Sequence, residues 1–513
     1  MAEAPLSAVP IGVDFPTALI RGLDHLLPKS DPTAWARCTI IVNTRRMQRR
    51  LRSILADGPP RLLPRILLLS EIDSFLPKPP PAAATALRRQ LELAELIAAL
   101  PDTETGLMPK AHSFDLAASL AGLIDELQGE GLSAQALLDL DVSNHSAYWE
   151  RTRAFIAIAD QYLQNRDAAP DAEARQRLVV EQLAELWANA PPDQPIILAG
   201  STGSRGSTRR LMQAIAELPK GQVILPGYDP HVPVEVWDRL LDQAIEDHPQ
   251  YRLAAVAQTL GQSPHDLPIW GDIDPIDPDR QKTISLSLRP APVTHAWIEE
   301  GPKLGSLEAA MAAMTLVESE SPRAEAQAIA LRLRKAAEDG ISAALITPDR
   351  MLTRHVAAAL DRWHILPDDS AGTPLRLTPP GRFLRHVSEL FFNPLDAQTL
   401  LTLLKHPLTH ADAQRNWHQL AVQKFELLLR RQGVPIPTAG DIRALAAKIV
   451  GDDHVEHEAH VAWGNWAAEV FCRPIPEGRH PLNHWITLHR NRAEAIAGGQ
   501  AGDPAELWAK AAG

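Results

Sequence analysis

Short, uninterrupted apolar runs alternate with amphipathic stretches in two parts of the chain, residues 1–81 and 191–305. The runs show no polar alternation, which is typical of strands buried on both faces of a parallel sheet. The stretches that follow several of them carry apolar residues at helical spacing. We therefore predict an α/β fold, with strands at residues 8–11, 39–42, 62–69, 196–198 and 222–226.

Two long regions show the helical period almost alone. Residues 82–190 follow a proline-rich boundary, PKPPP, and contain several amphipathic stretches, including the long one at residues 148–164. Residues 379–513 are helical again. Because strand patterns resume after residue 190, we expect the first region to be a helical subdomain inserted into the first sheet.

A shorter copy of the strand-to-helix pattern lies between these regions. Residues 316–318 and 344–346 are apolar strand candidates, and each leads into a predicted helix. This repetition predicts a second α/β domain. The expected organisation is one α/β domain in residues 1–81 and 191–305, a helical insertion in 82–190, the first part of a second α/β domain in 306–378, and a truncated helical insertion in 379–513.

Arginines gather where two of the predicted strands pass into helices. They are Arg45, Arg46 and Arg49, preceded by Thr44, after the strand at 39–42, and Arg350, preceded by Thr347, after the strand at 344–346. The carboxyl edge of a parallel sheet is where α/β proteins bind ligands, and a helix amino terminus favours anions. We predict phosphate contacts at these positions. The alternative is that these arginines are merely solvated.

The first strand-to-helix turn does not have the residues of a nucleotide-hydrolysing site. It offers Gly12 and Asp14 where a P-loop needs several glycines and a lysine, and Gly-Lys-Ser/Thr occurs nowhere in the 513 residues. Ala199 and Gly200 follow the strand at 196–198, where a motor ATPase carries two acidic residues for magnesium. We therefore expect no catalytic residues and no cofactor in this chain.

A small-residue loop after the strand at 196–198 is the other candidate for phosphate binding. It consists of Gly200, Ser201, Thr202 and Gly203. Backbone N–H groups of such a loop, together with the following helix terminus, can hold a phosphate. A tight turn that simply requires small residues explains the same sequence.

Composition limits the classes of function. The net charge of −12 argues against a protein that coats nucleic acid indiscriminately, because such binding needs an excess of Lys and Arg, but it does not exclude a local basic groove. No apolar run approaches the roughly 20 residues of a membrane span, and the amino terminus lacks the features of a signal peptide. We expect a cytoplasmic protein without a membrane partner.

Cysteines and histidines offer little metal chemistry. Cys38 and Cys472 are too far apart in sequence to suggest a disulfide framework or a ligand pair, and we predict that both are small buried residues. His454, His457 and His460 recur every third residue, but they lack the order of H-E-x-x-H, so no metal site is predicted.

Several motifs in this order resemble the AddB family, the subunits of AddAB helicase-nucleases of the alphaproteobacterial type that process double-strand DNA breaks. The motifs are TIIVNTRRMQRRL, LLPRILLLSEID, PIILAGSTGSRGSTRRLMQAIAELPKGQVILPGYD, ESPRAEAQAIALRLRKAAEDGISAALITPDRMLTRHV, TPPGRFLRHVSEL and LLTLLKHPLT. The resemblance extends through the whole chain, and none of these motifs is a catalytic signature.

The resemblance implies two RecA-like domains of the superfamily 1 helicase type with helical insertions, the second domain being incomplete here. It implies a degenerate ATP site, which agrees with the missing lysine and acidic pair. Thr44, Arg45 and Arg46 would fall in the first motif that contacts single-stranded DNA. Arg323, Thr347 and Arg350 would fall in the second RecA-like domain.

The resemblance also implies partners and cofactors. The partners would be an AddA-type helicase-nuclease subunit, DNA ends and single-stranded DNA, in recombination repair. Full-length members carry a nuclease domain with Mg²⁺ ligands and, in many, an iron-sulfur cluster, and we expect this chain to end before that domain.

Two other functions are open from the residues alone. A transferase that uses a phosphosugar or a nucleotide would bind phosphate at the loop of residues 200–203. A scaffold that binds only protein would agree with the acidic net charge.

Overall fold

The computed structural model describes residues 4–99, 113–133, 135, 162, 170–410, 414–450, 454–500 and 502–511. The chain divides into two compact units, Met1–Leu316 and Val317–Gly513. Each unit has its own hydrophobic core. Apart from residue 162, the helix predicted at residues 148–164 lies outside the described residues.

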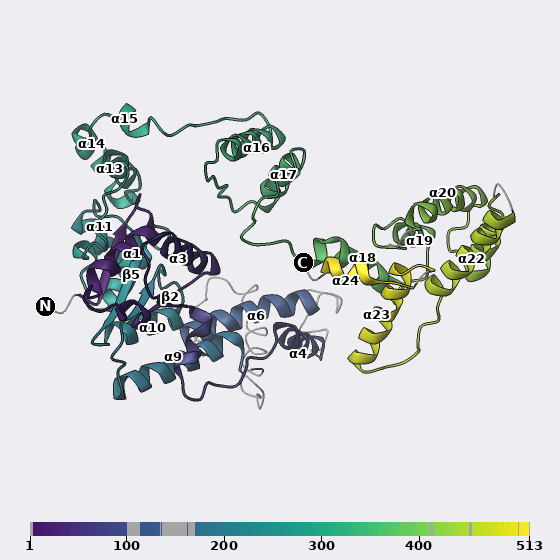
Figure 1. Cartoon of the computed structure of the whole chain (residues 1–513), viewed down its shortest axis with the longest axis horizontal. Coiled ribbons are helices and arrows are strands. Elements are labelled where there is room, and N and C mark those ends of the chain that lie inside the picture. The colour runs from purple at the N-terminus through teal and green to yellow at the C-terminus, as the bar shows by residue number, and fades with distance from the viewer. Residues whose placement is uncertain are drawn as a thin grey trace, which may run out of the picture. The chain divides into compact units, whose positions relative to one another are not determined.

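A parallel sheet forms the centre of the first unit (Figure 1). Its strands, in the spatial order β1-β5-β4-β2-β3, are β1 (Leu6–Pro10), β2 (Thr39–Val42), β3 (Arg65–Leu68), β4 (Ile196–Ala199) and β5 (Gly221–Tyr228). Every residue of β1, β2 and β4 is buried. The prediction of an α/β fold with a parallel sheet is therefore confirmed.

The third strand is shorter than the apolar run that predicted it. Leu62 and Leu63 are 52% and 56% exposed, and pairing with β2 begins only at Arg65. Pro64 lies directly before the strand, and proline has no N–H group with which to join the hydrogen-bond ladder.

Helices cover both faces of the sheet. On one face, α1 (Phe15–Leu26) and α3 (Arg45–Asp57) pack against Ile40, Val42 and their neighbours. On the other face, α9 (Ala172–Asn189) and α10 (Gly206–Ala216) pack against Ile41, Leu198 and theirs. Successive strand residues thus point to opposite cores, as the pleat requires.

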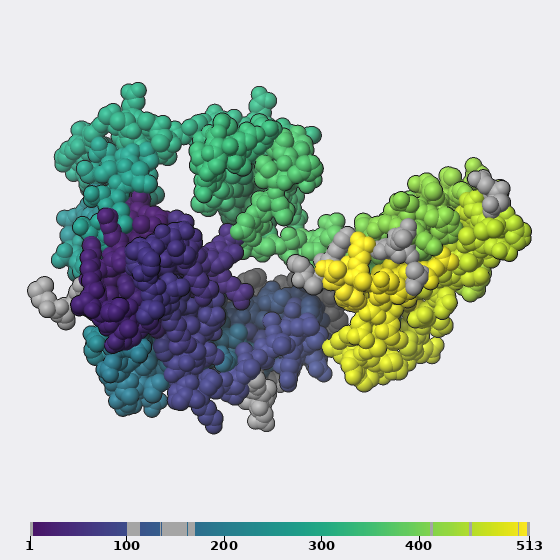
Figure 2. Space-filling view, in the orientation of Figure 1, coloured from purple at the N-terminus to yellow at the C-terminus, as the bar shows by residue number. Residues whose placement is uncertain are grey.

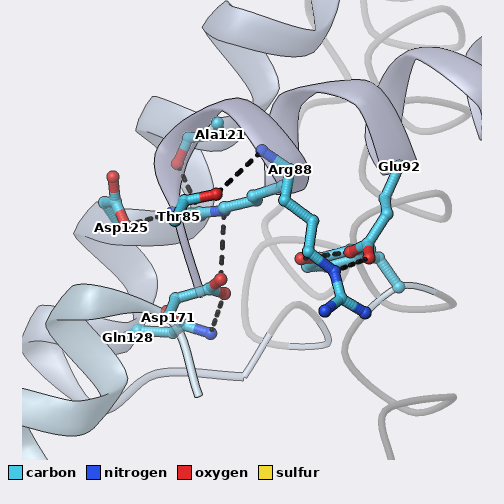
Figure 3. A network of polar contacts seen from close by, with 9 residues as sticks. Thr85, Arg88, Glu92, Ala121, Asp125, Gln128 and Asp171 are labelled. Carbon is cyan, nitrogen blue, oxygen red and sulfur yellow. Dashed lines mark hydrogen bonds and ion pairs between the residues drawn. The ribbon is translucent and has the colours of Figure 1, made fainter. Parts of the chain in front are cut away.

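The inserted region contributes helices α4 (Ala86–Ala99) and α6 (Ser113–Glu130). Arg89 is 6% exposed and joins them to the start of α9, because it donates to Asp125 Oδ1 at 2.5 Å and to the Ala121 carbonyl at 2.8 Å. Its Nε also lies 3.5 Å from Asp171 Oδ1 (Figure 3). Burying one cation among acceptors from two other segments ties the insertion to the α/β core.

The remaining helices of the first unit flank β1 and β5 or lie in connections. They are α2 (Ala34–Arg37), α11 (Val234–Asp242), α12 (Tyr251–Thr259), α13 (Pro278–Ser287), α14 (Ala296–Glu300), α15 (Leu307–Met311) and the short 3₁₀ turns η1 (Leu69–Phe75), η3 (Pro264–Asp266), η4 (Ala291–Val293) and η5 (Gly301–Lys303).

The second unit begins with a helix pair, α16 (Pro322–Glu338) and α17 (Arg350–Asp361), which share a small core around Ala330 and Leu360. The strands predicted at residues 316–318 and 344–346 are wrong: neither segment forms a strand or pairs with one. Leu316 is 86% and Ile346 is 93% exposed. An apolar run becomes a buried strand only where neighbouring strands and covering helices exist, and none of the described residues supplies them here.

A helical bundle forms the rest of the second unit. Its core includes the fully buried Phe383, Phe425 and Trp463. Its elements are the turn η6 (Leu375–Leu377) and the helices α18 (Pro379–Glu389), α19 (Ala397–Leu404), α20 (Arg415–Gln432), α21 (Ala439–Ala446), α22 (His454–Phe471), α23 (Leu482–Ala497) and α24 (Ala505–Ala511). Within the described part of the chain, no helix is both long enough and apolar enough to cross a bilayer.

Candidate nucleic-acid interface

The start of α3 carries a basic surface. Thr44 caps this helix, since its Oγ1 accepts a hydrogen bond from the Met47 N–H at 3.1 Å. The buried residues Leu51 and Leu55 anchor one side of the helix to the sheet. The arginines therefore occupy the opposite, solvent-facing side, as amphipathic spacing dictates.

All five arginines of α3 are exposed, and they are Arg45, Arg46, Arg49, Arg50 and Arg52. Among the residues that the structure describes, no carboxylate forms an ion pair with Arg45, Arg49 or Arg50. The first turn of α3 contains no acidic residue either. Cations at a helix amino terminus oppose the helix dipole, so this arrangement does not stabilise the helix. A bound anion would reverse that disadvantage.

The basic end of α3 lies at a topological switch point of the sheet. The chain leaves β2 toward one face, through α3, and leaves the neighbouring β4 toward the other face, through α10. Such a divergence opens a crevice at the carboxyl ends of the two strands, where α/β proteins bind ligands. Asn43 bridges the crevice, because its Nδ2 donates to the Gly200 carbonyl at 3.1 Å. The structure thus brings Thr44 and its arginines beside the loop of residues 200–203.

The loop itself has the geometry of a tight turn. Gly200 and Gly203 have φ angles of +78° and +63°, and a Cβ on Gly203 would lie 2.7 Å from Val256. The N–H of Gly203 donates to Ser201 Oγ at 3.3 Å, inside the loop. Small residues are therefore required by the backbone, whatever the loop binds.

Carboxylates from outside the loop already occupy the amino end of α10. Glu130 Oε1 accepts from the Gly206 N–H at 2.9 Å, and its carboxylate also pairs with Arg209. Glu173 pairs with Arg205. A phosphate at this helix end would have to displace Glu130, so the geometry favours the tight-turn explanation over the phosphate loop.

The amino end of α1 is closed in the same way. Asp14 caps it, since Oδ2 accepts from the Thr17 N–H at 3.2 Å. In a P-loop protein this helix end holds phosphate. Here a carboxylate of the chain takes the place of the anion.

A cavity of about 460 Å³ lies at the carboxyl ends of β1 and β5. Its polar walls are bonded to one another: Gln250 Nε2 donates to the Gly227 carbonyl at 2.9 Å, and Gln250 Oε1 accepts from the Asp229 N–H at 3.1 Å. Burial lowers the pKa of His248, which also lines it. Among the described residues that form the walls, Arg280 could neutralise a phosphate, but it already pairs with Asp277 at 2.8 Å.

Three predicted residues lie in the second unit. Arg323 is exposed in the first turn of α16, two residues after the capping residue Ser321. Thr347 Oγ1 accepts from the Asp349 N–H at 3.0 Å, and Arg350 pairs with Asp369 at 3.2 Å. Thr347 and Arg350 are therefore together at the start of α17, where Arg350 is partly neutralised within its own unit.

Metal and thiol chemistry has little support. Among the described residues no group of three His, Cys, Asp or Glu side chains could hold a metal ion. His460 is 1% exposed and bonds the Glu456 carbonyl, whereas His454 and His457 are exposed. Cys38 is fully buried, which confirms its prediction as a small core residue, and burial raises the pKa of its thiol to about 12. Cys472, predicted to be buried as well, is only half-buried.

Sequence reasoning missed the residues that decide between the candidates. Glu130 and Glu173 come from the inserted region, 76 and 32 residues away from the groups that they bind. No role is predicted for Asn43 from the sequence. Nothing in the local sequence indicates that one stretch is neutralised and the other is not, because residues 45–52 and residues 205–210 both contain several arginines and no acidic residue.

Comparisons with known proteins add no identity. No protein-family model matches this chain, and no curated protein has a significant match to it.

Proposed function

We propose that this chain is a DNA-binding, helicase-like subunit without ATPase chemistry of the P-loop kind, which holds single-stranded DNA on the basic end of α3. In this proposal it works beside a motor partner of the AddA type that pulls DNA through a complex processing double-strand breaks for recombination. The nuclease and any Mg²⁺ or iron-sulfur centre would belong to other parts of that complex.

One observation carries the proposal. Arg45, Arg49 and Arg50 are exposed, have no ion pair in the described part of the chain, and extend from a helix terminus at a switch point. Two other arginines near helix starts are neutralised by the chain itself, Arg209 by Glu130 and Arg350 by Asp369, whereas Arg323 at the start of α16 has no ion pair among the described residues. A cationic surface left unpaired on an acidic protein is suited to an anionic partner.

The binding mode would be electrostatic and independent of base sequence. The arginines of α3 would replace the counterions condensed on successive phosphates, and each guanidinium group can donate two parallel hydrogen bonds to one phosphate. The Thr44 cap and the buried Leu51 and Leu55 fix the helix against the sheet, so the surface is already formed before DNA arrives.

The finer architecture belongs to the same proposal. The five-stranded parallel sheet would be the first RecA-like domain, and α16 with α17 would belong to the second. Carboxylates occupy the amino ends of both α1 and α10, from Asp14 and Glu130 respectively. This supports a domain with the fold of a nucleotide-binding protein whose phosphate-binding positions are filled by its own side chains. They also weaken the alternative of a phosphosugar or nucleotide transferase.

The test is charge reversal on α3. Arg45→Glu combined with Arg49→Glu should weaken binding of a fluorescein-labelled (dT)₃₀ by about tenfold or more at 0.1 M salt, because two attractions become repulsions. The matched control is Arg239→Glu with Arg332→Glu, two exposed arginines on α11 and α16 that have no ion pair in the described residues. The net charge of this control variant changes by the same amount as that of the α3 variant. Equal loss in both variants, or none in either, would contradict the assignment to α3.

A further inference from the structure

The amino-terminal half of α23 lies outside the core of the helical bundle. The buried residues of this helix, Arg492, Ala493, Ile496 and Ala497, are all in its second half. Residues 482–491 include no buried side chain, and Leu482 and Ile486 are 56% and 57% exposed. Figure 1 shows the connection from α22 arriving at this end of α23, and Figure 2 shows the yellow surface that the helix contributes to.

Aromatic rings gather on this half-helix. The rings of His480 and His484 are 4.6 Å apart with an interplanar angle of 31°, and Trp485 lies 5.7 Å from the first ring and 6.1 Å from the second. Trp485 is half-buried against Phe391, whose ring is 6.5 Å away. Contact with Phe391 fixes the indole, and the exposed His484 ring leaves part of the cluster open to a planar ligand.

The same segment is basic. Residues 473–493 contain four arginines and three histidines but a single acidic residue, Glu477, in a chain whose net charge is −12. Arg479 and Arg490 are exposed and have no ion pair among the described residues. Arg490 lies six residues beyond His484, which is about 9 Å along the helix axis and about one and two-thirds turns around it, so a bound strand would pass around the helix between the ring cluster and Arg490.

We propose that this surface, formed by Arg479, His480, His484, Trp485 and Arg490, binds single-stranded nucleic acid. Bases stack on the three rings, and the two arginines hold flanking phosphates. Rings combined with unpaired arginines are the features that proteins use to bind single strands without sequence preference. The ligand class rests on the proposed function, but the site is separate from α3 and stands on its own residues.

An acidic protein segment is the other partner that a basic, partly apolar surface could take. The ring cluster favours nucleic acid, because every base offers a face for stacking whereas an acidic peptide gains little from three adjacent rings. The exposed Leu482 and Ile486 flank the cluster and would contact either partner.

The test uses the full chain and fluorescein-labelled (dT)₃₀ at low salt. Arg479→Glu with Arg490→Glu, and separately His484→Ala with Trp485→Ala, should each weaken binding about tenfold, as expected for one or two lost stacking or phosphate contacts. Trp485→Phe should retain most of the affinity, since a ring stays in place. Circular dichroism checks that each variant is folded, and Arg239→Glu with Arg332→Glu controls for charge.

A second measurement locates the contact directly and does not depend on folding of a variant. The wild-type chain is irradiated with an oligonucleotide that contains 5-iodouracil, and the cross-linked peptides are identified by mass spectrometry. Cross-links within residues 479–490 support the proposal. Their absence while peptides of α3 are cross-linked would overturn it and leave the proposed function standing.

The remaining outcomes also separate the two proposals. Loss of binding on changing α23 but not α3 supports this surface and removes the assignment to α3. No oligonucleotide binding by the folded wild-type chain overturns both. Binding of poly-glutamate to the wild-type chain, weakened by Arg479→Glu with Arg490→Glu while (dT)₃₀ binding is unchanged, would assign the surface to an acidic protein partner and overturn the nucleic-acid site.

Discussion

Replacing Arg45 by glutamate should stabilise the protein while weakening its interaction with DNA. Arg45 is the first residue of α3, it is exposed, and it has no ion pair in the described part of the chain. Arg45→Glu replaces an unfavourable cation by a favourable anion at the positive end of the helix dipole. Each such interaction amounts to about 0.3–1 kcal/mol, and both signs change, so we expect a gain of about 1 kcal/mol after screening at this exposed site.

Urea unfolding at low ionic strength measures this gain, and a thermal scan should show a rise of about 2 °C for a unit of this size. Arg52→Glu is the matched control, because it removes the same charge from the same helix two turns further on, where the dipole effect has faded. The gain should shrink in high salt. A lower stability of Arg45→Glu, or an equal gain in both variants, would show that Arg45 does not oppose the helix dipole.

Adding an oligonucleotide should favour the stability of the wild-type chain over that of Arg45→Glu. A ligand that binds only the folded state raises the melting temperature by an amount that grows with the logarithm of its affinity. We expect (dT)₃₀ to raise the melting temperature of the wild-type chain by more than it raises that of the Arg45→Glu variant. Arg45→Glu would then be more stable without DNA but gain less from DNA, as expected for a residue that serves binding and not folding.

Two further predictions concern stability. Burial lowers the pKa of His406 to about 4, and the positive charges of His386 and Arg415 add to the effect. As the pH falls below 6.5, the unfolded chain therefore binds a proton at His406 before the folded chain does. The free energy of unfolding should therefore fall, by at most about 3 kcal/mol, as the pH drops from 6.5 toward 4, and His406→Gln should flatten that part of a urea-unfolding profile. Arg89→Ala removes the guanidinium group that bonds Asp125 at 2.5 Å and lies 3.5 Å from the buried Asp171 carboxylate, so it should destabilise the insertion by up to about 3–5 kcal/mol, seen as faster hydrogen exchange in α4 and α6. Unchanged exchange would contradict this structural role.

The sheet could be predicted where burial on both faces leaves a clear mark in the sequence. Residues 39–42 form β2 as predicted, and residues 196–198 lie within β4, because helices on both sides demand apolar residues at every position. The sequence predicts Thr44 only as a phosphate contact, and its role as the cap of α3 is seen only in the structure.

The same rule failed at residues 316–318 and 344–346. Their apolar character predicts burial, but burial depends on partners that lie elsewhere in the chain or outside it. Leu316 and Ile346 are almost fully exposed because no described strand pairs with either segment. A local pattern states what a residue is suited to and cannot state whether the complementary surface is present.

Electrostatic partners were the least predictable part of the candidate site. Arg45 and Arg209 look alike in sequence, yet Glu130 neutralises only the second. The pairing spans 79 residues and depends on how the inserted helices pack on the sheet. Similarly, the exposure of the first half of α23 follows from the length of the helix relative to the bundle, which periodicity does not reveal.

Binding of single-stranded DNA can be measured by fluorescence anisotropy of a DNA with a labelled single-stranded tail, titrated with the full chain over a series of salt concentrations. If the arginines of α3 bind the DNA backbone, the logarithm of the binding constant falls linearly with the logarithm of the salt concentration. Each phosphate contact on a single strand contributes a slope of about −0.7, so three to five contacts on α3 give roughly −2 to −3.5. A folded chain that does not bind at low salt, or binds with a slope near zero, would contradict the claim that unpaired arginines hold the DNA backbone.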